Sequence, residues 1–233
     1  MSATNAPDLT WSQRWSYWFR QRTHVWSGAT QWDALFPDIK KPVRELRALE
    51  RVPSTFVQSA DVFTPESLRE LSTEAEETLE SKGYLHNGKW NAVVGQAGYD
   101  FLDSFAIPSV IEAHTGLKVT EPHGGTYIAY LNAGEKLDFH LDDFSFGEVN
   151  MLLCVKHEGV PDGSDGSGTV FIGPHGYEKH VLMPGDFLIF DGAFTPHGRT
   201  PLVADERVIL LALAFNTTFP RNIDETSLPE PPL

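Results

Sequence analysis

The sequence predicts a mainly β protein, a sandwich or jelly-roll barrel with helices at its flanks. After residue 118, short segments rich in β-branched and aromatic residues alternate with turns that contain glycine or proline, and regular spacing of this kind is typical of all-β barrels. Before residue 118, apolar residues recur at helical spacing in several segments. The chain has 233 residues, 41% of them hydrophobic and 12% aromatic, which is enough for one large core.

We expect one compact domain with two parts. Residues 1–55 form an N-terminal extension, and residues 56–233 form the barrel domain. Tryptophans recur at helical spacing in residues 9–26, with arginines between them, so this segment is predicted to be a helix that packs on the barrel. An interfacial membrane helix and a subunit contact are the alternatives for this segment. Residues 40–51 are charged and favour a helix, so a second helix is expected there. It should end before Pro53, because a proline restricts the residue before it.

Between the extension and the main run of strands, the sequence pattern changes several times. Residues 56–63 are predicted to be a strand, and residues 64–83 a helix that begins with a hydroxyl cap and a first-turn proline and ends at a glycine. Residues 84–105 mix polar and aromatic side chains and are expected to form a long ordered loop that contacts a substrate. Residues 108–114 are predicted to be a short helix.

The rest of the chain is expected to supply the strands of the barrel. Their predicted positions are 119–121, 126–131, 136–140, 148–156, 169–172, 178–183, 187–191, 194–197 and 207–215. Residues 161–168, rich in glycine, serine and aspartate, are expected to be a surface loop between two of these strands.

Composition argues against several classes of function. A net charge of −14 at pH 7 disfavours binding to nucleic acid or to an anionic membrane, because both would repel the protein, and it is compatible with a cationic substrate. The only cysteine, Cys154, leaves no disulfide framework and no cysteine-rich zinc site. The N-terminal residues lack the basic and apolar regions of a signal peptide, and no apolar run reaches the length of a membrane span. We therefore expect a cytoplasmic protein.

A candidate metal site begins with His140 and Asp142. On an extended strand, residues two positions apart point to the same face, so this imidazole and this carboxylate can hold one divalent ion together. We expect His197 to be the third ligand, since two imidazoles and one carboxylate form the facial triad of non-haem Fe(II) oxygenases. A single His-x-Asp sequence is more often an ordinary polar pair. Three other histidines are alternative ligands that this argument does not favour: His157, His175 and His180.

Four segments occur in the order typical of one known family. They are Tyr127 to Asp142, with a strand, a turn and the His-x-Asp pair; Gly168-Thr169-Val170-Phe171; Met183 to Phe190, with a Pro-Gly-Asp turn; and Pro196-His197-Gly198, followed by the basic residue Arg207. On these segments, residues 118–216 resemble the Fe(II)/2-oxoglutarate-dependent dioxygenase superfamily and, within it, the prolyl 4-hydroxylase-like branch. The resemblance implies a double-stranded β-helix, a jelly-roll barrel of the cupin-like type.

The resemblance also implies cofactors and residue roles. The three expected ligands would hold Fe(II), while 2-oxoglutarate and O2 would occupy the open positions of the ion as co-substrates. Arginine offers a planar fork for a carboxylate, so Arg207 is expected to bind the C5 carboxylate of 2-oxoglutarate. Tyr130 and Thr169 are expected as further contacts of the co-substrate.

The sequence departs from the family pattern near this clamp. Many relatives have Arg-x-Ser where this chain has Arg207-Val208-Ile209, the prolyl 4-hydroxylase branch often uses lysine there, and Cys154 stands where some relatives have a second tyrosine. The partner of Arg207 at the C5 carboxylate therefore stays open between Thr169, Thr200 and Asn150. Halogenases of the superfamily replace the metal-binding carboxylate by a small residue, so Asp142 argues against halogenation.

Three functions stay open on the sequence. The first is hydroxylation or oxidative cyclisation of a small-molecule metabolite in specialised metabolism; acidic residues near the expected mouth, Asp100 and Asp103 among them, suggest an amine-bearing one. The second is hydroxylation of a peptide or protein. The third is a non-catalytic metal-binding barrel, against which a separate carboxylate clamp argues. The residues expected to contact the substrate are Trp90, Tyr99, Asp143, Phe144 and Arg199. The sequence indicates no oligomeric state.

Overall fold

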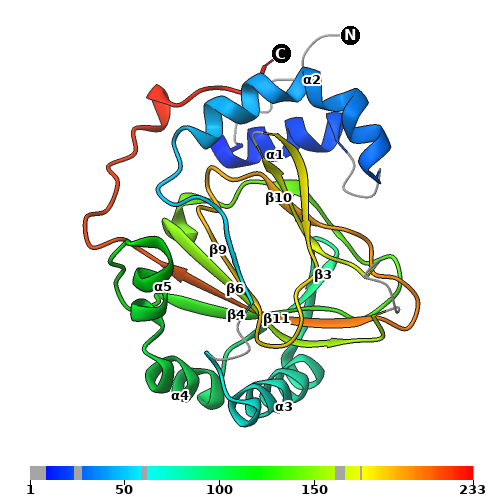
Figure 1. The fold of residues 1–233 in the computed structure, drawn as a ribbon, viewed down its shortest axis with the longest axis vertical. Helices are drawn as coiled ribbons and strands as arrows, with labels where there is room; N and C mark the ends of the chain where they lie inside the picture. Colours follow the sequence, from blue (N-terminus) through cyan, green and yellow to red (C-terminus); the bar gives the residue numbers. More distant parts are fainter. Residues whose placement is uncertain (1–8, 24–27, 59–61, 161–165, 174, 233) are drawn as a thin grey trace.

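Two antiparallel sheets face each other, and helices cover the outer face of each (Figure 1). This computed structural model describes residues 9–23, 28–58, 62–160, 166–173 and 175–232. The predictions for Trp26, for residues 59–61 and for residues 161–165 lie outside the described part of the chain. The mainly β architecture with flanking helices is confirmed.

The larger sheet has seven strands in the order β1-β9-β6-β11-β4-β3-β2, and the smaller sheet has four in the order β5-β10-β7-β8. The larger sheet contains β1 (Thr55–Val57), β2 (Tyr84–His86), β3 (Lys89–Val93), β4 (Gly124–Tyr130), β6 (Val149–Glu158), β9 (Phe187–Phe190) and β11 (Arg207–Phe215). The smaller sheet contains β5 (Leu137–His140), β7 (Thr169–Gly173), β8 (Gly176–His180) and β10 (His197–Arg199).

The helices lie in two groups, one on each sheet (Figure 1). They are α1 (Trp11–Arg22), α2 (Gly28–Arg47), α3 (Pro65–Lys82), α4 (Gln96–Phe105) and α5 (Ile107–Thr115). Thr10 begins α1 with a capping box to Gln13, and Thr64 caps α3 just before a first-turn proline, so both helix starts follow from local chemistry. The predicted helices over residues 64–83 and 108–114 are confirmed.

The smaller sheet is covered by α1 and α2. Trp11, Trp15 and Phe19 are buried against Phe139 and Val170 of the smaller sheet. The arginines between the tryptophans point away from this cluster, which is the amphipathic pattern of a helix packed on a barrel. Within the part of residues 9–26 that the structure describes, helix α1 packs on the smaller sheet through its aromatic side.

The larger sheet has two different faces. On its outer face, residues such as Tyr127 and Leu211 pack against Leu71 of α3 and the neighbouring helices. On its inner face, Tyr130 and Leu210 join residues of the smaller sheet in a separate buried cluster between the two sheets. Because side chains alternate along a strand, the four central strands β9, β6, β11 and β4 contribute to both clusters.

Several predicted elements differ in the structure. The prediction of a loop over residues 84–105 is wrong, because this segment contains β2, β3 and α4. Asn87 and Gly88 have positive φ angles (51° and 77°) and form the tight turn that joins β2 to β3. The helix predicted for residues 40–51 belongs to α2, which begins at Gly28 and ends at Arg47. Residues 119–121 form only an isolated bridge at Val119, and the expected strands at 178–183 and 194–197 are shifted.

Within the described residues, every helix is too short or too polar to cross a bilayer.

Candidate metal centre and the buried arginine beside it

His140 and His197 lie opposite each other on neighbouring strands. The first ends β5 and the second begins β10, and the antiparallel pairing of these strands places the two residues in register. Their ring centroids lie 4.2 Å apart. The sheet therefore brings together two histidines that are far apart in the sequence, as expected for two ligands of one ion.

Asp142 follows β5 and is fixed by its backbone and by Asn150. Its backbone N–H donates to the carbonyl oxygen of Gly192 at 2.9 Å, and its Oδ2 accepts a hydrogen bond from Nδ2 of Asn150 on β6. Gly192 approaches this closely because it has no side chain: an added Cβ would overlap Oδ2 of Asp142 and Nδ2 of Asn150. These contacts leave Oδ1 of the carboxylate for other partners.

The Oδ1 atom of Asp142 faces both imidazoles. It lies 3.5 Å from Nε2 of His140 and 3.7 Å from Nε2 of His197. The Nδ1 atoms are engaged elsewhere, since His140 donates to the carbonyl oxygen of Asp138 at 3.0 Å and His197 to that of Thr195 at 2.9 Å. A carbonyl oxygen only accepts, so Nδ1 carries the proton in each ring and the Nε2 lone pair is directed towards Oδ1.

Electrostatics favour the protonation states that a metal requires. Burial alone raises the pKa of the Asp142 carboxyl, but His197, His140 and Lys89 outweigh burial and hold this pKa well below its ordinary value. Burial, together with the neighbouring His140, lowers the pKa of His197 to about 4. A carboxylate and a neutral imidazole are the forms that coordinate a divalent ion.

The three side chains fit a divalent ion with open coordination positions. Their ligand atoms lie within 4.8 Å of one another. Nitrogen and oxygen ligands bind such ions at roughly 2.0–2.2 Å, so small side-chain movements close the site around an ion. Two imidazoles and one carboxylate on one side of an octahedral ion leave its other positions for further ligands. The carbonyl contacts of the imidazoles and the amide of Asn150 supply the outer hydrogen bonds that orient such ligands.

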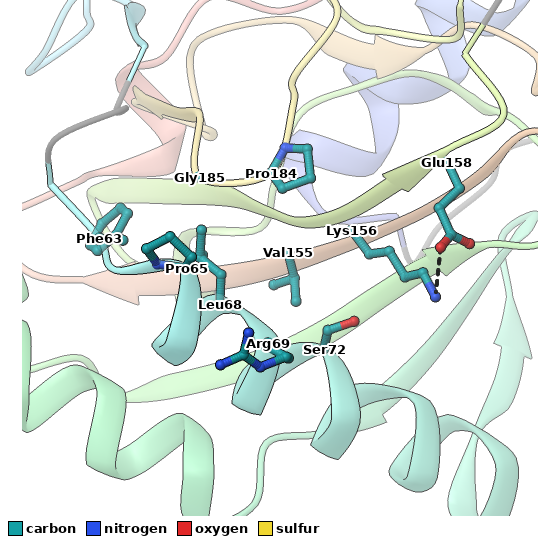
Figure 2. Close-up of a pocket in the computed structure, with 10 residues that line it drawn as sticks. All are labelled: Phe63, Pro65, Leu68, Arg69, Ser72, Val155, Lys156, Glu158, Pro184 and Gly185. Atoms are coloured by element: carbon teal, nitrogen blue, oxygen red, sulfur yellow. Dashed lines mark ion pairs between the residues drawn. The ribbon is translucent and has the colours of Figure 1, made fainter.

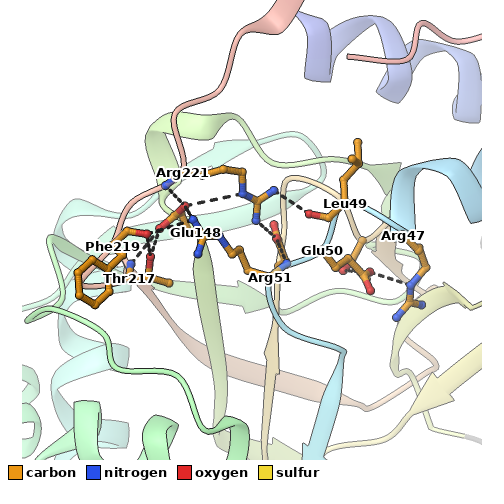
Figure 3. A network of polar contacts seen from close by, with 10 residues as sticks. Arg47, Leu49, Glu50, Arg51, Glu148, Thr217, Phe219 and Arg221 are labelled. Atoms are coloured by element: carbon orange, nitrogen blue, oxygen red, sulfur yellow. Dashed lines mark hydrogen bonds and ion pairs between the residues drawn. The ribbon is translucent and has the colours of Figure 1, made fainter. Parts of the chain in front are cut away.

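The loop that carries His197 is braced by Glu50, which pairs with Arg47 at the end of α2 (Figure 3). Thr195, whose carbonyl oxygen accepts from His197, donates through its hydroxyl to Glu50. Glu50 pairs with Nε of Arg47 at 2.7 Å, and the two side chains are only 9% and 11% exposed. Burial raises the pKa of Glu50 to about 7, although Arg47 and Thr195 oppose this shift.

A second brace holds Asp191, which precedes Gly192. Its Oδ2 accepts from the backbone N–H of Arg51 at 2.9 Å and from the guanidinium of Arg221 at 2.6 Å. Glu148 accepts from the backbone N–H of Arg221 in the same network (Figure 3). Segments from both ends of the described chain thus fix the loop against which two of the candidate ligands rest.

Arg199 is a buried cation in the interior between the sheets. It is 2% exposed and lies two residues after His197, so it points to the same side of β10. Its guanidinium lies 5.1 Å from the ring centroid of Tyr130 and donates to the carbonyl oxygen and hydroxyl of Ser167 and, at 3.5 Å, to the hydroxyl of Thr169. Within the described part of the chain, the guanidinium forms no ion pair and its Nε has no hydrogen-bond partner. Among the described residues, no anion is in direct contact with this buried charge.

Arg207, the expected carboxylate clamp, lies elsewhere. It is exposed at the start of β11, whereas Val208 and Leu210 point into the interior. Side chains alternate along a strand, so Arg207 lies on the outer side. The expected role of Arg207 is therefore corrected on geometric grounds, and Arg199, expected to contact substrate, takes the position of an interior cation.

The three residues considered as partners of the arginine at the C5 carboxylate lie in different places. Thr169 lies beside Arg199. Asn150 instead holds Asp142, and the hydroxyl of Thr200 accepts from the backbone N–H of Gly168 at 2.8 Å. Of the three partners considered from the sequence, only Thr169 contacts the buried guanidinium among the described residues.

Most residues expected at the substrate do not face the centre. Trp90 points to the outer side of β3 and donates to Glu135 at 3.3 Å, and Tyr99 is 56% exposed on α4. The acidic residues Asp100 and Asp103 are also exposed on α4, a helix whose Phe101 packs on the outer face of the larger sheet.

The two residues after the His-x-Asp pair serve the local fold. Asp143 caps the short 3-10 helix Phe144–Phe146 by accepting from the backbone N–H of Ser145 at 3.0 Å. The ring of Phe144 stacks on Trp11 of α1 with centroids 5.4 Å apart. Both contacts hold the chain just beyond Asp142.

The alternative histidine ligands lie away from the triad. His157 is buried and contacts Glu206 through Nε2 at 2.6 Å and the carbonyl oxygen of Leu182 through Nδ1. His180 packs against Phe171 on the far edge of the smaller sheet, and His175 is exposed. Within the described residues, the group with metal-ligand spacing is the triad.

Sequence reasoning missed Lys89, Gly192 and the ligand-holding role of Asn150. Lys89 begins β3 on the inner face of the larger sheet and interacts electrostatically with Asp142 and His197. The Asn-Gly turn before it is a hairpin signal that could have placed it on a strand. The contact between Gly192 and Asp142 has no signal in the sequence, because it depends on tertiary packing.

A surface groove of about 510 Å³ lies between helix α3 and the larger sheet (Figure 2). It is formed by the start of α3, by β6 and by the turn before β9, and Lys156 pairs with Glu158 at its wall at 3.1 Å. The groove shares no residue with the candidate metal centre.

No protein-family model matches the sequence, and no curated protein matches it. Solved structures match at the level of the fold. A prolyl-4-hydroxylase from Pseudomonas putida has a TM-score of 0.58 and 16% identity, covering 75% of this chain and 98% of its own. SnoN, a non-haem α-ketoglutarate-dependent epimerase from nogalamycin biosynthesis, has a TM-score of 0.56 and 16% identity, covering 77% and 83%. EctD from S. alaskensis, solved with 2-oxoglutarate and 5-hydroxyectoine, has a TM-score of 0.56 and 12% identity, covering 74% and 75%.

These likenesses establish the fold. The double-stranded β-helix predicted from the resemblance is confirmed, since all three structures cover about three quarters of this chain.

Proposed function

We propose that the protein is an Fe(II)/2-oxoglutarate-dependent oxygenase that couples the decarboxylation of 2-oxoglutarate to the oxidation of a substrate. The observation that carries the proposal is the arrangement of His140, Asp142 and His197 with their ligand atoms facing one another. The fold is similar to that of SnoN, which was also solved with Fe³⁺, α-ketoglutarate and nogalamycin RO, and this likeness supports the same reaction class.

Arg199 would bind the C5 carboxylate of 2-oxoglutarate. Its guanidinium is buried without an anion, and a carboxylate would complete its hydrogen bonding in a planar fork. Thr169, already in contact with Arg199, and the nearby hydroxyl of Tyr130 would add donors at the same end of the co-substrate. Burial raises the pKa of Tyr130 well above its ordinary value, so its hydroxyl keeps its proton and acts as a donor.

The protein's own residues position and protect the chemistry. When bound, Fe(II) would be chelated by 2-oxoglutarate and would activate O2 for the oxidation of a substrate C–H bond. Asn150 and the two backbone carbonyls hold the ligands in orientation, and the apolar wall of Phe171 and Phe190 against His197 excludes water from the inner side of the site.

The proposed substrate is a small metabolite that is hydroxylated or closed into a ring. The alternative is a peptidyl hydroxylase, which a structural neighbour supports: a prolyl hydroxylase from Trichoplax adhaerens, solved with a peptide fragment of hypoxia inducible factor, has a TM-score of 0.56 and 14% identity. A screen of metabolites and peptides for substrate-stimulated succinate formation separates the two.

Anaerobic addition of Fe(II) and 2-oxoglutarate tests the reaction class. We expect a visible metal-to-ligand charge-transfer band that the His197→Ala variant abolishes. A protein that gives no band and binds zinc tightly instead is a non-catalytic barrel, and the proposal fails.

A further inference from the structure

The hairpin of β2 and β3 carries a lysine to the inner face of the larger sheet. In the ladder between β3 and β4, Asn91 pairs with Ile128, which belongs to the interior cluster, whereas Trp90 pairs with Ala129, which belongs to the outer one. Lys89 lies two residues before Asn91 and therefore on the same inner face.

The charge of Lys89 acts on the metal centre. Lys89 interacts electrostatically with Asp142 and with His197, and its own side chain is only partly exposed. Burial lowers the pKa of Lys89, while Asp142 opposes this shift. Among the described residues, none accepts a hydrogen bond from its ammonium group or forms an ion pair with it within 4.0 Å.

The two interior cations therefore have different surroundings. The charged or ionisable neighbours of Arg199 are Tyr130, Cys154 and Glu206, at the inner end of the interior. Lys89 instead acts on two of the triad residues. A co-substrate held by Arg199 would therefore use a different cation from Lys89, which acts on the triad itself.

The charge balance of the loaded site leaves Lys89 uncompensated. With Fe(II) and the 2-oxoglutarate dianion in place, the charges of the ion, the co-substrate, Asp142 and Arg199 would cancel, while Glu206 pairs with His157 at 2.6 Å. Lys89 then contributes one positive charge near the ion without an anionic partner, which is costly in a partly buried position.

We propose that Lys89 binds a carboxylate of the substrate and so selects substrates that carry one. The inference rests on the proposed function and narrows its substrate class to molecules with a carboxylate. An amine-bearing substrate that also has a carboxylate is an amino acid or a related zwitterion. A hydrogen-bonded ion pair with a charged donor is strong enough to change affinity by roughly 10- to 100-fold.

Acetate and acetamide are a matched pair of probes for this site, since they have the same shape and differ in charge. Each is titrated into anaerobic protein with Fe(II) and saturating 2-oxoglutarate, and the shift of the charge-transfer band is followed. In the wild type, acetate should shift the band and acetamide should not. The Lys89→Gln variant should need about 10-fold more acetate or more, and Lys89→Arg should restore the response.

Lys136→Gln is the control variant, because this lysine follows the turn after β4 and pairs with Asp138 at 3.2 Å. It should respond to acetate as the wild type does. The inference is overturned if acetate fails to shift the band of the wild type, if it acts equally on Lys89→Gln, or if Lys89→Gln loses the band before any acetate is added. A wild type that forms no band with Fe(II) and 2-oxoglutarate refutes the proposed function instead.

Discussion

The side-chain amide of Asn150 donates a hydrogen bond to Oδ2 of Asp142, while Oδ1 of the same carboxylate faces both histidines of the triad. Asn150→Ala removes this orientation and should weaken Fe(II) binding about 10- to 100-fold, as is typical when an outer hydrogen bond of a metal ligand is lost. Isothermal titration under anaerobic conditions measures the affinity. An affinity equal to that of the wild type shows that the amide does not position the ligand.

Gly192→Ala should damage the same site by a steric route. The added Cβ would overlap both Oδ2 of Asp142 and Nδ2 of Asn150, so the carboxylate must move. We expect weaker Fe(II) binding and a changed charge-transfer band. Gly124→Ala is the matched control, because a Cβ at Gly124 meets no atom within 4 Å. Equal behaviour of the two variants contradicts the steric argument.

The contrast between Arg207 and Arg199 shows what could be read from the sequence. The His-x-Asp pair and the later histidine were predictable, because ligand spacing and strand alternation are local properties. Which arginine enters the interior was not, because it depends on which face of β11 meets the helices. Val208 and Leu210 occupy the inner face, and Arg207 is left outside. The inward position of Arg199 can be predicted from side-chain alternation after His197 only when residues 197–199 are known to form a strand.

The missed hairpin has a similar cause. Residues 84–93 mix polar and apolar side chains on two short strands, so neither alternation nor propensity is strong there. The Asn-Gly pair was the one local signal for a turn. Strand β3 is stabilised by pairing with β4, a contact that the sequence does not display.

Arg199→Met should abolish tight binding of 2-oxoglutarate without unfolding the protein. Truncating one partner of a buried, hydrogen-bonded charge pair costs about 2–5 kcal/mol, so the KM for 2-oxoglutarate should rise at least 30-fold or so. The stability of the ligand-free protein should stay or increase, because the variant removes a buried charge without an anion. Arg207→Met, an exposed control, should leave both quantities unchanged. If Arg207→Met raises the KM for 2-oxoglutarate and Arg199→Met does not, then Arg207 binds the C5 carboxylate.

Glu50→Gln should change how stability depends on pH. Burial raises the pKa of Glu50 from 4.5 to about 7 in the folded protein, so its contribution to stability is complete below pH 4.5 and is lost as the pH rises through about 7. The wild type should therefore lose stability relative to the variant over this window, by up to about 1.4 kcal/mol per pH unit. Urea unfolding at several pH values measures the difference. Glu45→Gln, an exposed control on α2, should follow the wild type.

The backbone carbonyl of Pro229 is predicted to hold the aromatic helix α1 on the barrel. It accepts hydrogen bonds from Nε1 of Trp11 at 2.9 Å and Nε1 of Trp15 at 3.0 Å, and both indoles are buried. Ending the chain at Leu228 leaves two buried donors without this acceptor, and each costs about 1–3 kcal/mol. We expect a marked fall in Tm.

This truncation also removes Glu230, whose exposed ion pair with Arg14 has a distance of 2.7 Å. An exposed pair contributes about 0–1 kcal/mol, so Glu230→Gln in the full chain should lower Tm only slightly and isolates that contribution. If the two variants lose the same stability, the ion pair and not the Pro229 carbonyl secures α1. Just after β5, the backbone N–H of Leu141 donates to the hydroxyl of Ser16 on α1. If the truncated protein binds Fe(II) more weakly and Glu230→Gln does not, the packing of α1 on β5 supports the position of His140 and Asp142.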